Sequence, residues 1–130
     1  MIKTTHAFSS FSVNDLAAAK EFYANKLGLT VADGEMAGTL VLRLPDGHEV
    51  FLYEKPDHLP ATFTVLNLVV ENIEAAVDAL NAVGVVTKIY DDPDFGTDAR
   101  GIVWSKAAGY GPDIAWFRDP AGNVISVLAE

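Results

Sequence analysis

The chain has 130 residues, half of them apolar, and its 18 acidic and 9 basic side chains give a formal net charge of −9. This acidity disfavours binding to nucleic acid, which depends on neutralising phosphates with Lys and Arg. The absence of cysteine excludes disulfides, thiolate metal sites and Cys nucleophiles. No apolar run approaches the roughly 18–20 residues that cross a bilayer, and the N-terminus does not resemble a signal peptide, so we expect a cytoplasmic protein without a membrane partner.

The first half of the chain predicts a strand, a helix and three further strands. Residues 6–13 are rich in β-branched, aromatic and small polar side chains, which suit a strand that is buried on one face. Asp15 is a good N-cap, and apolar residues then recur at helical spacing as far as Gly28, which can take the left-handed conformation that ends a helix. The remaining strands are expected near residues 29–33, 39–44 and 49–54, with a turn at 45–47.

The second half predicts the same order after a linker that contains two prolines. A strand at 63–70 precedes the N-cap Asn72 and a helix that ends at Gly84. Four strand segments are then expected, near residues 85–90, 101–105, 113–118 and 123–128, the first of them short or continuous with its neighbour. Two loops rich in Gly, Pro and Asp, 91–101 and 106–113, are predicted to be mobile and able to cover a ligand site.

The two halves are related by a repeat. Residues 8–24 align with residues 65–81 at a constant offset of 57, and one residue is then lost before Leu27-Gly28-Leu29 meets Val83-Gly84-Val85. Such a repeat predicts two similar modules. We therefore predict an α+β fold of two βαβββ modules, at 1–56 and 63–130 with a linker at 57–62, which together form one domain.

Two segments resemble the vicinal oxygen chelate superfamily, which includes glyoxalase I, extradiol dioxygenases, fosfomycin-modifying enzymes and bleomycin-binding proteins. They are SVNDLAAAKEFYANKLGL at 12–29, which resembles a strand-to-helix segment, and FRDPAGNVISVL at 117–128, which resembles the closing hairpin. The resemblance implies curved mixed sheets that enclose a cleft between the two modules, with helices on the outside. It also implies a homodimer.

In enzymes of this superfamily, His and Glu side chains from the first and last strands of each module hold a divalent metal. The positions of this chain that match them hold Phe8, Phe51, Val65 and Ser126. None of these is the imidazole or carboxylate that such a metal prefers, so we expect no metal and no other cofactor.

Two alternatives keep an enzymatic function open. His6 and Glu49 stand two residues before Phe8 and Phe51, and side chains two apart in a strand share a face. A metal displaced onto His6 and Glu49 would give a lyase, isomerase or dioxygenase of this superfamily. A metal-free enzyme would instead use His6 or Glu49 as a general base.

Strand alternation and the resemblance predict one set of side chains that line the cleft. Apolar walls with a few polar groups are typical of small-molecule sites, although the same side chains could also pack together and close the cleft. Our leading hypothesis is a module that binds or sequesters a small aromatic or amphipathic molecule. The predicted lining residues are Phe8, Ser10, Phe51, Tyr53, Val65, Asn67, Trp116, Arg118 and Ser126, with Phe63, Val124 and Leu128 on the same face.

Overall fold

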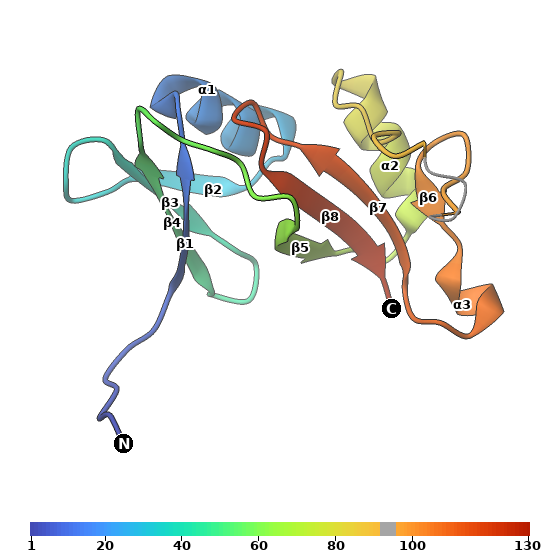
Figure 1. Cartoon of the computed structure of the whole chain (residues 1–130), viewed down its shortest axis with the longest axis horizontal. Coiled ribbons are helices and arrows are strands. Elements are labelled where there is room, and N and C mark those ends of the chain that lie inside the picture. Colours follow the sequence, from blue (N-terminus) through green and yellow to red (C-terminus); the bar gives the residue numbers. More distant parts are fainter. Residues whose placement is uncertain (92–95) are drawn as a thin grey trace. The chain divides into compact units, whose positions relative to one another are not determined.

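The computed structural model describes residues 1–91 and 96–130, which divide into two compact units, Met1–Pro60 and Ala61–Glu130 (Figure 1). Each unit contains one four-stranded mixed sheet and one principal helix. The predicted α+β class and the two βαβββ modules are therefore confirmed. No helix in the described ranges is long and apolar enough to cross a membrane.

The first unit follows the predicted order, and its sheet has the strand order β1-β4-β3-β2. Its elements are β1 (Ser9–Val13), α1 (Leu16–Glu21), η1 (Phe22–Lys26), β2 (Thr30–Asp33), β3 (Thr39–Arg43) and β4 (Glu49–Glu54). Asp15 caps α1 as predicted, because its Oδ1 accepts a hydrogen bond from the Ala18 amide at 3.0 Å. The predicted start of the first strand at residue 6 was wrong, since β1 begins at Ser9.

The second unit repeats this arrangement with the strand order β5-β8-β7-β6. Its elements are β5 (Thr64–Val69), α2 (Ile73–Ala82), β6 (Ile102–Val103), α3 (Ser105–Ala108), β7 (Asp113–Arg118) and β8 (Val124–Ala129). Asn72 caps α2 through the Ala75 amide at 3.0 Å, which matches Asp15 in the first unit. Both helices therefore begin with the same capping chemistry.

The predicted strand at 85–90 was wrong, because these residues form no strand. The segment makes side-chain hydrogen bonds to a later stretch of chain instead of a backbone ladder. Thr87 Oγ1 donates to the Arg100 carbonyl at 2.6 Å, and Lys88 Nζ donates to Thr97 Oγ1. The β-branched residues Val85 and Thr87 are only 5% and 2% exposed. They belong to a buried segment that side-chain hydrogen bonds hold against residues 97–100.

The principal helix of the first unit contains one more residue than that of the second. It has six α-helical and five π-helical residues, against ten α-helical residues in α2. In the π-helical turn the Leu27 amide donates to the Phe22 carbonyl at 3.0 Å, five residues back. A π-helical turn is wider than an α-helical one and absorbs an extra residue, which accounts for the residue lost between the aligned halves.

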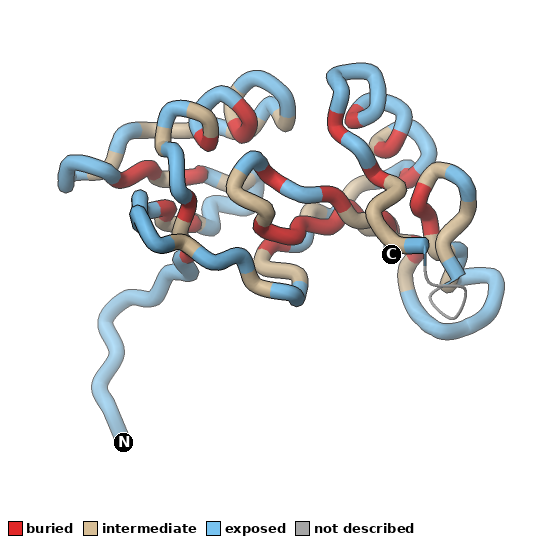
Figure 2. Tube along the Cα trace, turned by 45° about the horizontal axis from the view of Figure 1, so that its top comes forward, coloured by how far each residue is buried: buried red, intermediate tan, exposed pale blue. Residues whose placement is uncertain are grey.

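One face of each sheet packs against the helix of its own unit and forms the core. Buried positions occur on both the strands and the helices (Figure 2). In the first unit the Phe11 ring lies 6.3 Å from the Tyr23 ring of η1. We call the opposite face of each sheet its helix-free face. The core-facing strand residues are Phe11, Val13, Leu40, Leu42, Val50 and Leu52 in the first unit, and Leu66, Ile102, Ala115, Phe117, Ile125 and Val127 in the second.

The hairpin between β7 and β8, which the resemblance implied, is closed by Asp119. The Asp119 carboxylate accepts hydrogen bonds from the Ala121 amide, the Asn123 amide and Asn123 Nδ2, at 2.9 to 3.0 Å. Gly122 has a φ of 85°, which favours glycine. Because Asp119 is only 4% exposed, these bonds stand in for the water that its carboxylate has lost.

Candidate functional site

The helix-free face of the first unit carries a ladder of aromatic rings. The strand register aligns Ser10 of β1 with Phe51 of β4, and Phe51 with Val41 of β3. We call His6, Phe8, Phe51 and Tyr53 the aromatic ladder, because successive ring centroids lie 5.9, 6.0 and 6.4 Å apart. These separations lie in the range of favourable ring–ring contacts.

Three members of the aromatic ladder are exposed, namely His6, Phe8 at 59% and Tyr53 at 37%. Exposed apolar side chains are common singly, but a contiguous group of them marks a binding surface. The aromatic ladder can therefore supply a planar apolar contact to a ligand.

The helix-free face of the second unit carries a more polar row. The register aligns Asn67 of β5 with Ser126 of β8, and Ser126 with Trp116 of β7. Ser126 Oγ donates to Asn67 Oδ1 at 2.5 Å, and the Tyr90 ring meets the Trp116 ring edge-on at 5.5 Å. Arg118 lies in the next row, opposite Val124.

A β-bulge interrupts β5 at one of the predicted site positions. Thr64 pairs with Val124 and Leu66 with Ile125, so Val65 is the extra residue. The alternation that predicted the direction of Val65 does not extend through the bulge. The cleft lining as a whole, Val65 included, stays a prediction.

The metal-ligand set that the resemblance implies does not fit this chain. The four matching positions hold two phenylalanines, a valine and a serine whose hydroxyl is bonded to Asn67. Of the alternative ligands, Glu49 forms an ion pair with Arg43 Nε at 3.3 Å, and His6 lies against Phe8. Among the residues that the structure describes, no group of three or more His, Asp or Glu side chains could hold a metal ion.

Three residues near the helix-free faces escaped the sequence analysis. His58 Nδ1 lies 2.6 Å from the Ser12 hydroxyl, and Ser12 aligns with Tyr53 across β1 and β4. Alternation along the predicted strand 39–44 would have found Val41. His58 and Tyr90 lie in irregular segments, where no periodic signal reports which way a side chain points.

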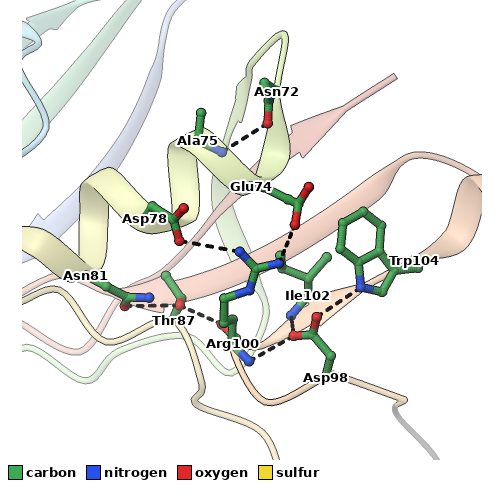
Figure 3. A network of polar contacts seen from close by, with 10 residues as sticks. All are labelled: Asn72, Glu74, Ala75, Asp78, Asn81, Thr87, Asp98, Arg100, Ile102 and Trp104. Atoms are coloured by element: carbon green, nitrogen blue, oxygen red, sulfur yellow. Dashed lines mark hydrogen bonds and ion pairs between the residues drawn. The ribbon is translucent and has the colours of Figure 1, made fainter.

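The predicted loop 91–101 is tethered where the structure describes it, and its residues 92–95 lie outside the described residues. Asp98 accepts hydrogen bonds from the Arg100 and Ile102 amides and from Trp104 Nε1, each at 2.9 Å (Figure 3). Burial raises the pKa of Asp98, but these three hydrogen bonds and the Arg100 charge outweigh it, so the pKa is lowered overall.

Arg100 joins this loop to α2. Its guanidinium reaches Glu74 at 2.6 Å and Asp78 at 3.4 Å (Figure 3). The hydrogen bond with Glu74 is the main cause that raises the pKa of Arg100. The other predicted loop, 106–113, begins with the last three residues of α3, and the Lys106 amide donates to Asp113 Oδ1 at 3.0 Å.

Comparison with solved structures gives the same fold across nearly the whole chain. An integron cassette protein from the mobile metagenome of the Halifax Harbour sewage outfall is 20% identical with a TM-score of 0.70, covering 98% of this chain and 100% of its own. TnmS3, an antibiotic binding protein from Streptomyces sp. CB03234, is 22% identical with a TM-score of 0.65, covering 98% of each chain. A bleomycin resistance determinant encoded on the transposon Tn5 is 19% identical with a TM-score of 0.69, again covering 98% of each chain.

No curated protein matches the sequence. The family model of the Glyoxalase/Bleomycin resistance protein/Dioxygenase superfamily, however, matches residues 5–127. This match covers nearly the whole chain and includes both units. The chain therefore belongs to the Glyoxalase/Bleomycin resistance protein/Dioxygenase superfamily.

Proposed function

We propose that this protein binds a small aromatic or amphipathic molecule on the helix-free faces of its sheets, without a metal, as a binding or sequestering module. The observation that carries the proposal is the aromatic ladder, which occupies the face where the superfamily's enzymes place metal ligands. Phe8 and Phe51 stand at two of those positions, and their rings contact each other. A site of this composition offers apolar contact area and a few orienting polar groups, but no Lewis acid.

Two of the structural relatives support this reading. One is described as an antibiotic binding protein and another as a bleomycin resistance determinant. The first description names binding of an antibiotic, and the second names resistance to bleomycin. Both proteins share the fold of this chain. The net charge of −9 favours neutral or cationic ligands over anionic ones.

Metal content is the first test of the proposal. Protein purified without added metal is analysed for metals and then titrated with Ni, Zn, Mn and Fe while its melting temperature is followed. We expect no stoichiometric metal and no specific stabilisation. A stoichiometric metal that is lost in His6→Ala or Glu49→Ala would overturn the proposal in favour of a metalloenzyme.

Ligand binding is the second test. A ligand-observed NMR screen of small aromatic compounds compares wild type with Phe51→Ala and with the control Tyr110→Ala. Tyr110 is a ring that is 89% exposed in the loop after α3, outside the strands that form the helix-free faces. We expect about tenfold weaker binding only in Phe51→Ala, because burying an aromatic contact contributes roughly 1–2 kcal/mol. Equal loss in both variants, or no hits, contradicts the proposal.

The homodimer and the cytoplasmic location expected from the sequence stay predictions. Light scattering across a range of protein concentrations tests the first, and a monomer at all concentrations contradicts it.

A further inference from the structure

The row of Asn67, Ser126 and Trp116 contains a side-chain amide whose orientation is fixed. Ser126 has no exposed surface, and its hydroxyl donates to Asn67 Oδ1 at 2.5 Å. A carboxamide is planar, so holding its oxygen also sets the direction of its NH2 group. Ser126 therefore orients an amide group that would otherwise rotate at the surface.

The oriented NH2 group is available to a ligand. Asn67 is exposed, and within residues 1–91 and 96–130 its Nδ2 donates to no other group. A donor that is already held in one direction loses little conformational entropy when it binds an acceptor. This is the arrangement expected of a group that selects a ligand by hydrogen bonding.

We propose that Asn67 determines ligand specificity by donating from Nδ2 to an uncharged oxygen acceptor, such as a ketone or amide carbonyl, on an aromatic ligand whose ring contacts Trp116. Ser126 is the positioning residue. The inference rests on the proposed function and adds the chemical class of the ligand. The net charge of −9 disfavours a carboxylate as the acceptor.

The spacing of the row suits such a ligand. Asn67 and Trp116 lie on strands that flank β8, so their backbones are two strand spacings apart, about 10 Å. A span of about 10 Å is comparable to the length of a two-ring aromatic that carries a carbonyl substituent. The small Ser126 side chain lies between them.

The first unit has no counterpart of this pair. At the offset of 57, Ser10 stands where the second unit has Asn67, and the register places Phe51 opposite Ser10 where Ser126 is opposite Asn67. The hydrogen-bonded pair is thus a feature of one unit only and does not follow from the repeat.

The test uses two probes that differ in one acceptor, 2-acetylnaphthalene and 2-ethylnaphthalene. Their dissociation constants are measured by NMR titration of wild type, Asn67→Asp, Ser126→Ala and the control Asn14→Asp, which changes an exposed amide of the first unit that is not part of the row. We expect wild type and Asn14→Asp to prefer the acetyl probe about three- to tenfold, the contribution of one hydrogen bond. Asn67→Asp should lose this preference, and Ser126→Ala should reduce it by about half or more.

The two probes distinguish a failure of the specificity inference from a failure of the proposed function. If wild type binds both equally, or if Asn67→Asp keeps the preference, the specificity inference is wrong and the proposed function stands. If neither probe binds wild type, the inferred ligand class is contradicted, and the NMR screen of small aromatic compounds decides the proposed function. The χ1 couplings of the Asn67 side chain provide an independent check. We expect a single rotamer in wild type and averaging between rotamers in Ser126→Ala. Averaging in wild type would overturn the positioning role of Ser126.

Discussion

The two units have similar cores and the same topology but differ on their helix-free faces. Both have one parallel strand pair, a helix capped by an Asp or Asn side chain, and the same spatial order of strands. On the helix-free face, the first unit carries the aromatic ladder and the second carries the hydrogen-bonded row around Ser126. This difference indicates that packing against the helix constrains the side chains on one face of each sheet. The side chains on the other face are free to differ between the units.

The units also differ in how the chain returns from helix to sheet. In the first unit three residues separate η1 from β2, whereas in the second residues 83–101 separate α2 from the two-residue β6. The described part of this segment is held by Thr87, Asp98 and Arg100. The second unit thus replaces part of a backbone ladder with side-chain hydrogen bonds, and this replacement can be tested by substitution.

The largest effect is expected for Gly101→Ala. Gly101 has a φ of 90°, and a Cβ there would lie 2.0 Å from the Thr87 carbonyl oxygen. Backbone strain and overpacking together should lower the free energy of unfolding by about 3–5 kcal/mol. The matched control in the first unit is Gly38→Ala, where φ is 78° but no atom lies within 4 Å of the added Cβ. Urea unfolding should show a loss of only about 1 kcal/mol there, and equal losses would refute the close approach of the two segments.

The next largest effect on stability is expected to differ between the β7–β8 turn and the β3–β4 turn. Asp119→Ala removes a buried carboxylate that accepts three hydrogen bonds, and we expect a loss of about 3 kcal/mol. Asp46→Ala, in the turn between β3 and β4, removes one exposed hydrogen bond to the His48 amide and should cost under about 1 kcal/mol. Urea unfolding of both variants measures the difference, and a larger loss for Asp46→Ala would contradict it.

Asp98→Ala is expected to lower the free energy of unfolding by about 2 kcal/mol near pH 7, and this loss depends on pH. The pKa of Asp98 is lowered in the folded protein, so its stabilisation is fully present above the unfolded carboxyl pKa of about 4. It is lost as the pH falls through the lower, folded pKa. Unfolding free energies of wild type and variant should differ by a constant amount from about pH 5 to 8 and converge below about pH 4. A difference that grows on acidification would contradict this account.

The smallest effects should be the same in both units. Asp15→Ala and Asn72→Ala each remove the side-chain oxygen that caps a helix, and each should cost about 1 kcal/mol. Thermal or urea unfolding measures both. Similar losses would support the structural equivalence of the two helices, whereas a loss in only one of them would break it.

Much of the fold could be predicted because its signals are local and repeated. The caps at Asp15 and Asn72 depend on residues that are neighbours in the chain. The strands depend on the periodicity of their apolar residues. The gap in the repeat even marked the extra residue that the π-helical turn of the first unit absorbs. The strand at 85–90 was mispredicted because β-branched residues suit a buried tether as well as a ladder.

The candidate site was less predictable. The resemblance placed Phe51 and Ser126, and strand alternation added Ser10 and Asn67; the register pairs Ser10 with Phe51 and Asn67 with Ser126. It could not foresee the bulge at Val65, because a bulge shifts the pairing without a sequence signal of its own. The contacts of His58 and Tyr90 arise from irregular segments and depend on tertiary structure alone.

The most direct test of metal-free binding on the helix-free faces is a ¹H–¹⁵N correlation map of the protein in excess EDTA, recorded with and without a ligand found in the screen. We predict that the perturbed signals cluster on the helix-free faces, around Phe8, Phe51 and Tyr53 and around Asn67 and Trp116, and that they are the same without EDTA. Perturbations that disappear in EDTA and return with a divalent metal, or that cluster on α1 and α2, would contradict the account.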